Sequence, residues 1–149
     1  MSAGDDGGDG GELQGAGGPA AAADSELYTR ALAAAARAYA PYSGFAVGAT
    51  VVDEDGAVFD GVNVENACYP AGQCAERVAL GAFATAGGRR LAAVAVASPG
   101  ANCVPCGACL QALAEFGDPR VVCRQEGELR VWRLSELLRL PFTLEKAHP

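Results

Sequence analysis

Histidine is almost absent from this sequence: among 149 residues the only one is His148, next to the C-terminus. A Ser-His-Asp triad or a Cys-His pair needs a histidine held within the fold, and an HExxH zinc motif needs two. The sequence therefore excludes most histidine-based catalysis, and any metal site must use other ligands.

Long apolar runs and a basic leader are also missing. No stretch of 18 residues is continuously apolar, so we predict no transmembrane helix. The chain starts with acidic residues where a signal peptide has a basic segment followed by an apolar one. We therefore predict no secretory signal and a cytoplasmic protein. Hydrophobic residues make up 50% of the chain, which is enough for the core of one domain.

Positive charge is scarce, with 11 Lys and Arg against 18 Asp and Glu and a net charge of −7. A chain of this kind has no electrostatic footprint for a phosphate backbone, so we predict no nucleic-acid partner. Residues 1–23 hold eight of the 20 glycines, four of the acids and no Lys or Arg. We predict that this Gly/Ala/Asp-rich tail is disordered and that residues 24–149 form the domain.

Hydrophobic periodicity and turn signals predict nine elements in the order α-β-β-α-β-α-β-β-α. The predicted helices cover residues 25–39, 74–86, 105–116 and 135–138. The predicted strands cover residues 45–53, 57–64, 91–97, 121–124 and 128–132. Short turns make the first two strands an antiparallel hairpin and do the same for the last two. The alternating middle requires a parallel pair, which predicts an α/β fold: a mixed five-stranded sheet with helices on both faces.

Six cysteines are present, and in a reduced compartment they are more typical of catalysis or metal binding than of disulfides. Cys74 stands at the start of one predicted helix, and Cys106 and Cys109 lie three residues apart at the start of another. Helix N-termini favour thiolates. Three thiolates brought together there predict a zinc site with its fourth tetrahedral position open, as in catalytic sites.

Glu76 follows Cys74 by two residues, so it can lie beside the metal without binding it. A carboxylate there can take a proton from a water in the open position and pass it on. Arg77 can hydrogen-bond a sulfur and withdraw the excess charge of three thiolates. Cys-Ala-Glu followed by Pro-Cys-Gly-Ala-Cys is the three-cysteine form of the zinc-deaminase signature.

The sequence resembles the small, homotetrameric cytidine deaminases from about Leu27 to Glu145. Four blocks carry the resemblance: residues 39–49 and 61–70, Cys-Ala-Glu-Arg at 74–77, and Pro-Cys-Gly-Ala-Cys at 105–109. The resemblance implies zinc-dependent hydrolysis of cytidine and deoxycytidine to uridine, deoxyuridine and ammonia in pyrimidine salvage. It also implies one zinc per chain on Cys74, Cys106 and Cys109.

The same resemblance implies the remaining roles in the site. Glu76 would move protons to the pyrimidine ring nitrogen and to the leaving ammonia. Residues that bind the nucleoside would be Phe45 on the base, Ala75 on the pyrimidine edge, Asn63 and Glu65 on the ribose, and Tyr69 and Phe142 at a neighbouring subunit's site.

The sequence departs from the family at Leu110, where the family usually has arginine, and after Leu138, where the usual proline is shifted to Pro141. Leu110 leaves open a deaminase of a modified cytosine nucleoside. The cysteines alone would also suit a CxxC thiol–disulfide protein, or a closed zinc module with Cys103 as the fourth ligand, but both hypotheses leave Glu76 unexplained. Otherwise Cys68, Cys103 and Cys123 are expected to be small buried hydrophobes.

Overall fold

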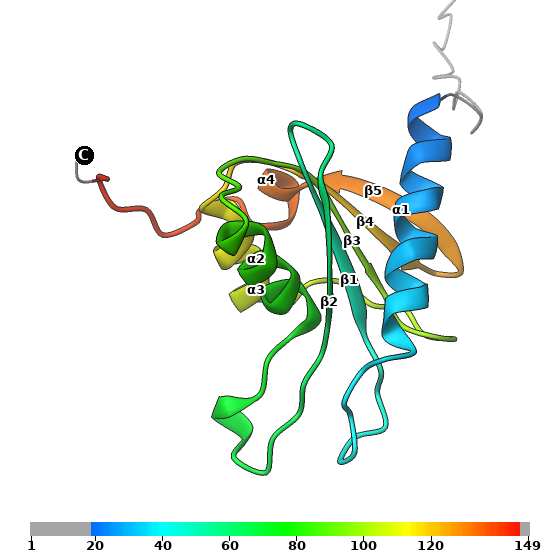
Figure 1. The fold of residues 1–149 in the computed structure, drawn as a ribbon. Helices are drawn as coiled ribbons and strands as arrows, with labels where there is room; N and C mark the ends of the chain where they lie inside the picture. The colour runs from blue at the N-terminus through cyan, green and yellow to red at the C-terminus, as the bar shows by residue number, and fades with distance from the viewer. Residues whose placement is uncertain (1–18, 147–149) are drawn as a thin grey trace, which may run out of the picture.

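A computed structural model describes residues 19–146. Its centre is a five-stranded sheet in the order β2-β1-β3-β4-β5 (Figure 1). The strands are β1 (Gly48–Asp53), β2 (Val58–Val62), β3 (Leu91–Ala97), β4 (Arg120–Gln125) and β5 (Glu128–Arg133). β3 and β4 are parallel, and the other neighbouring strands are antiparallel. The predicted mixed five-stranded sheet, with both of its hairpins, is confirmed.

Helices cover both faces of this sheet, as predicted. Helix α1 (Pro19–Ala35) packs on one face, and α2 (Ala75–Thr85) and α3 (Gly107–Ala114) lie on the other, with the short helix α4 (Leu134–Leu137) after β5 (Figure 1). A single 3-10 turn, η1 (Tyr69–Ala71), precedes α2. No helix within residues 19–146 combines the length and apolar character needed to cross a membrane.

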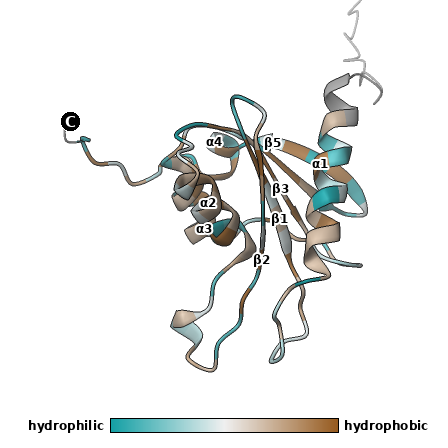
Figure 2. Cartoon of the chain, in the orientation of Figure 1, coloured by the Kyte–Doolittle hydropathy of each residue, from teal (hydrophilic) through white to brown (hydrophobic). Residues whose placement is uncertain are grey.

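The uniformly apolar strand β3 is buried between these two helical layers. Ala93, Ala95 and Ala97 pack with α1, whereas Val94 and Val96 pack with α2 and α3. Because successive side chains of a strand point to opposite faces, a strand covered on both sides needs apolar residues at every position. The central strands are accordingly the most hydrophobic part of the sheet (Figure 2).

Helix α1 begins at Pro19 and ends at Ala35, whereas the sequence predicted residues 25–39. Proline fits the first turn of a helix, and the alanines after it are strong helix formers. Asp24 therefore lies inside α1, where it is buried and pairs with Arg120 at 2.6 Å. The predicted boundary after Ala23 falls within this helix, and residues 1–18 of the predicted tail lie outside the described residues.

β1 begins at Gly48 and not at the predicted residue 45. The Val47 carbonyl still accepts from the Asn63 backbone N–H at 3.1 Å, but the ladder goes no further. The Asn63 side-chain amide instead accepts from the Val47 N–H and donates to the Phe45 carbonyl, both at 2.8 Å. The chain around residues 39–47 thereby becomes a loop that lies beside residues 63–73, past one end of the sheet (Figure 1).

Two glycines allow the helices to approach the sheet closely. A Cβ at Gly48 would overlap the backbone of α1, and a Cβ at Gly61 would overlap the Ala75 carbonyl and the Ala79 N–H of α2. Gly61 therefore sets how near the start of α2 lies to β2.

At the far end of the sheet, Glu126 and Gly127 form the β4–β5 turn with φ of 54° and 82°.

Candidate active site

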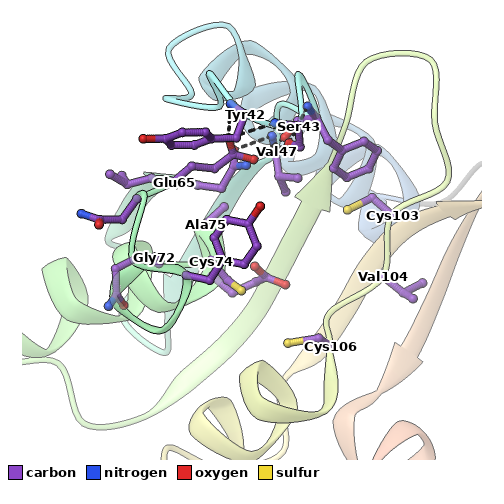
Figure 3. A pocket seen from close by; sticks show the side chains of 17 residues that line it. Tyr42, Ser43, Val47, Glu65, Gly72, Cys74, Ala75, Cys103, Val104 and Cys106 are labelled. Carbon is purple, nitrogen blue, oxygen red and sulfur yellow. Dashed lines mark hydrogen bonds between the residues drawn. The ribbon is translucent and has the colours of Figure 1, made fainter.

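A cavity of about 640 Å³ opens where the loops around residues 39–47 and 63–73 meet the starts of α2 and α3 (Figure 3). One side, which we call the thiol wall, consists of Cys74, Glu76, Cys106 and the Cys109 thiol grouped with them. The opposite side, the loop wall, consists of residues 42–47 and 63–66. Segments distant in sequence thus supply the two walls.

The thiol wall brings three cysteines together. Cys74 and Cys106 are the N-cap residues of α2 and α3, and Cys109 is on the first turn of α3. Their three sulfur atoms all lie within 4.8 Å of one another. Three sulfur donors at this spacing fit a zinc ion with one coordination position left for a small molecule. Cys103 is not part of this group, so the geometry gives no fourth sulfur ligand.

The helix starts affect the three thiols differently. Partial burial works against ionisation of Cys106. Hydrogen bonds from the Cys109 and Ala108 backbone N–H groups and with the Cys109 and Cys74 thiols together outweigh it, and the pKa of the Cys106 thiol is lowered. Burial raises the pKa of Cys74 and of Cys109, and the negative charge of Glu76 adds to this. The negative charges of Glu76 and of ionised thiols repel one another, and a cation bound among the sulfurs would offset this repulsion.

Glu76 is a buried carboxylate, 5% exposed, on the cavity floor beside these thiols. Burial raises the pKa of Glu76 above its ordinary value. A raised pKa makes a carboxyl group a better proton acceptor, and general acid–base catalysis requires a group that can accept a proton and return it.

The loop wall is joined internally by hydrogen bonds to Glu65. Glu65 Oε2 accepts from the backbone N–H groups of Tyr42 and Ser43 at 2.8 and 3.2 Å, and Oε1 accepts from the Ser43 hydroxyl (Figure 3). The Ser43 hydroxyl bond comes first among the causes that lower the pKa of Glu65 below its usual range. Glu65 is therefore a carboxylate at neutral pH.

Most of the other residues predicted to contact the nucleoside line the cavity, but Phe142 does not. Phe45, Asn63, Tyr69 and the buried Ala75 line the cavity. Phe142 does not line it: it is 72% exposed, on the extended C-terminal segment that follows α4 (Figure 1). The Gln111 side chain of α3 holds the Phe142 backbone through two bonds of 2.9 Å.

Arg77 is exposed on α2 and does not line the cavity. Its predicted contact with a sulfur atom stays a prediction. Leu110 is buried in the core under α3 and is likewise absent from the cavity lining. The departure from the family's usual arginine therefore lies outside the cavity lining of this chain.

The three remaining cysteines do not behave alike. Cys123 is buried, as expected, and burial raises the pKa of its thiol to about 12. Cys103 is half-buried and lines the cavity, where burial raises its pKa to about 11. Cys68 is exposed. The expectation of a buried Cys68 was wrong because it precedes the exposed 3-10 turn η1 and contacts no core.

Sequence reasoning missed Ser43 and Gln111. Both act through bonds to residues 22 and 31 positions away, and no spacing rule predicts such pairs. The available signal for Ser43 was its place in the block of residues 39–49 that resembles the family.

A family model, the cytidine and deoxycytidylate deaminase zinc-binding region, matches residues 21–125. The chain belongs to this deaminase family. The match includes every member of the thiol wall and the loop wall, and the three clustered sulfurs are a donor set that suits the family's zinc. The family resemblance and the fold expected from the sequence are thereby confirmed.

Known cytidine deaminases agree with this assignment. A cytidine deaminase of Halalkalibacterium halodurans is 42% identical over 123 residues, covering 80% of this chain and 93% of that protein. One from Mycobacterium tuberculosis is 43% identical over 120 residues, covering 80% and 89%. The crystal structure of the Burkholderia pseudomallei cytidine deaminase has a TM-score of 0.73 at 44% identity, covering 79% of this chain and 98% of that one. Neither the thiol–disulfide protein nor the modified-nucleoside deaminase gains support.

Proposed function

We propose that this protein is a zinc-dependent hydrolase that converts cytidine and deoxycytidine, with water, to uridine and deoxyuridine plus ammonia. The observation that carries the proposal is the buried Glu76 carboxylate beside three clustered thiols on the floor of a cavity. A metal and a proton carrier on one side of a substrate-sized space are what hydrolysis of an amino-substituted ring carbon requires.

Cys74, Cys106 and Cys109 would hold the zinc, one ion per chain. Zinc in such a site supplies an activated water for attack on the ring carbon. The buried position of Glu76 suits it to receive one proton from this water and place it on the ring nitrogen. It can then receive the proton of the hydroxyl added to the ring carbon and give it to the departing ammonia as the carbonyl forms. The same carboxylate can serve each transfer, because it lies buried beside the three thiols, and burial raises its pKa above the ordinary value.

A free nucleoside fits the loop wall better than a nucleotide does. None of the described residues that line the cavity is Lys or Arg, whereas Glu65 and Glu76 both line it. A carboxylate near the sugar repels phosphate, and no lining cation offsets that repulsion.

Hydrogen-bonding capacity supports the assignment of the sugar to Asn63 and Glu65. A carboxylate accepts about four hydrogen bonds, and Glu65 already accepts from two N–H groups and one hydroxyl. The Asn63 amide nitrogen donates one of its two N–H bonds to Phe45 and keeps the other. One ribose hydroxyl could therefore donate to Glu65 and accept from Asn63. Phe45 would pack on the base, and the Ala75 backbone would bind the pyrimidine edge.

We further propose a homotetramer in which a neighbouring subunit closes the cavity. Apolar side chains of the C-terminal segment are highly exposed, with Leu140 at 91%, Phe142 at 72% and Leu144 at 77%. Tyr69 at the cavity is 80% exposed. A second copy would cover both surfaces and dry the site, which metal-assisted hydrolysis favours. The cytoplasmic location expected from the sequence belongs to the same proposal.

The activity is tested by incubating the purified, zinc-loaded protein with a panel of cytosine bases, nucleosides and nucleotides and detecting products by mass spectrometry. We expect uridine and deoxyuridine from the nucleosides and little product from the nucleotides. Glu76→Gln with full zinc content is the matched control. Wild-type protein that converts none of the nucleosides would rule the function out.

Light scattering tests the assembly separately. We expect the mass of four chains. A monomeric mass together with full cytidine turnover would mean that one chain closes its own cavity.

A further inference from the structure

Ser43 joins the two parts of the loop wall through one hydroxyl group. Its Oγ donates a hydrogen bond to Glu65 Oε1 and accepts one from the Phe45 backbone N–H, with N and Oγ 3.0 Å apart. The residue proposed to hold the sugar and the residue proposed to pack on the base are thus connected by a single side chain.

Glu65 depends on this hydroxyl for its orientation. Its other hydrogen bonds, from the backbone N–H groups of Tyr42 and Ser43, both end on Oε2. Oε1 has Ser43 as its side-chain partner among the described residues. Because a glutamate side chain has three rotatable bonds, fixing both oxygens restricts the carboxylate to one plane, and the free acceptor position then points in one direction.

Phe45 is held from both ends of its peptide backbone. Its N–H donates to Ser43 Oγ, and its carbonyl accepts from Asn63 Nδ2 at 2.8 Å. The preceding Gly44 has a φ of 68°, a conformation that turns the chain between Ser43 and Phe45. Phe45 is 44% exposed at the cavity, so its backbone bonds help to fix where its ring lies.

We propose that Ser43 is a positioning residue for nucleoside binding, whose hydroxyl sets the Glu65 carboxylate and the Phe45 backbone in the arrangement that receives sugar and base together. This inference rests on the proposed deaminase function. Ser43 lies on the wall opposite the thiols, so its effect is on binding and leaves the chemical step at Glu76 intact.

The test compares Ser43→Ala, Ser43→Thr and Ser135→Ala with wild type in cytidine deamination over a range of pH. Ser135 is a matched control, because its exposed hydroxyl also bonds a carboxylate, Asp118, at 3.0 Å, but it does not line the cavity. For Ser43→Ala we expect KM to rise about tenfold, in line with loss of a hydrogen bond to a charged group, with zinc content kept and kcat changed less than about threefold.

Two further results distinguish positioning from general loosening of the loop. Loss of the hydroxyl bond raises the pKa of Glu65, so the acid limb of kcat/KM should move to higher pH in Ser43→Ala and return in Ser43→Thr. In the background of Glu65→Gln, Ser43→Ala should raise KM less than it does in wild type, because the bond to the Glu65 carboxylate is already altered and the bond to the Phe45 N–H is the part that remains to be lost.

An unchanged KM and acid limb in Ser43→Ala, with wild type active, would overturn this inference and leave the proposed function standing. An equal rise of KM in Ser135→Ala would also overturn it. Wild type without turnover of any cytosine nucleoside would defeat the proposed function, and this inference with it.

Discussion

The thiol wall is built from helix starts that rest on the core, whereas the loop wall is built from two loops that rest on each other. Cys109 and Glu76 are buried, and the Cys109 thiol lies with those of Cys74 and Cys106 as a donor set that a metal ion can bind. In the loop wall, Asn63 and Glu65 already hydrogen-bond to residues 42–47. The thiol wall is completed by the metal that binds to it. The loop wall is held in place by hydrogen bonds within the chain.

This difference separates the two tasks of the site. A metal site needs donors that converge and stay unpaired, so it is placed where the packed core fixes the backbone. A site for a flexible sugar needs a few polar atoms in fixed directions, and side-chain bonds across a loop can supply those. Substitutions in the thiol wall should therefore lower zinc content or kcat, whereas substitutions in the loop wall should raise KM.

The largest expected effect is at the metal. Cys106→Ser replaces a thiolate ligand with a poor zinc donor, so zinc should fall from about one per chain to almost none and deamination should be lost. Elemental analysis of the purified protein measures this. His148→Ala is the control and should keep its zinc; metal loss in that variant would contradict an all-cysteine site.

Glu76→Gln tests the thiol wall without touching a ligand. The amide has nearly the same shape but cannot accept and pass on a proton, so kcat should fall by about 10²–10⁴-fold, the usual contribution of a positioned acid–base group. Zinc content and melting temperature should stay near the wild-type values. More than about a tenth of the wild-type kcat would disprove the role of Glu76.

Gly61 lies where the two walls meet, because β2 leads into Asn63 and packs on the start of α2. Gly61→Ala would push its Cβ into the backbone of Ala75 and Ala79, at a cost of about 1–3 kcal/mol or more in unfolding free energy. Displacing the start of α2 should also lower zinc affinity. Denaturant unfolding and competition with a chelator measure the two effects.

Gly81→Ala is the matched control in the same helix. Nothing lies within 4 Å of a Cβ at Gly81, so alanine should be neutral or stabilise the helix by up to about 1 kcal/mol. Equal behaviour of the two variants would mean that Gly61 does not set the position of α2.

A smaller effect is expected in the loop wall. Asn63→Ala removes the side-chain bonds to Phe45 and Val47 and the N–H proposed for the ribose. KM for cytidine should rise about tenfold or more, while zinc content stays at one per chain. Steady-state kinetics measures KM, and metal analysis measures the zinc content. Loss of zinc in this variant would show that the two walls are not independent.

The smallest effect is expected from removing residues 1–18. The domain's described helices begin at Pro19, so turnover and assembly should be unchanged. Kinetics and light scattering on the shortened chain provide the check, and altered assembly would assign the segment a role.

Local pattern was enough to predict the elements whose environment is uniform along their length. Strand β3, at residues 91–97, was predicted with its observed bounds, because burial on both faces leaves an unbroken apolar run. The starts of α2 and α3 were predicted because cysteines and Pro105 mark them. The start of β1 and the end of α1 could not be predicted from local pattern. Bonds from Asn63 to residues 45 and 47 limit β1, and a bond from Tyr39 N–H to the Asn63 carbonyl draws the chain away after α1.

The candidate site shows the same limit. Cys74, Cys106 and Cys109 were recognisable from spacing because two of them share one helix turn and the third begins a motif. Other contacts join positions that are distant in sequence: the hydrogen bond from Ser43 to Glu65 and the hydrogen bond between Gln111 and the Phe142 backbone. Such pairs depend on tertiary structure, and a single sequence carries no period that would mark them.

The turn between β4 and β5 has a consequence for how such an enzyme could be adapted to heat. Glu126 adopts a left-handed backbone conformation with φ of 54°, which costs a residue with a bulky side chain about 1 kcal/mol relative to glycine. Asparagine or glycine relieves that cost, and the turn lies outside the cavity lining. Substitutions at this exposed hairpin, by evolution or by design, can thus change thermal stability without changing the reaction that the enzyme catalyses.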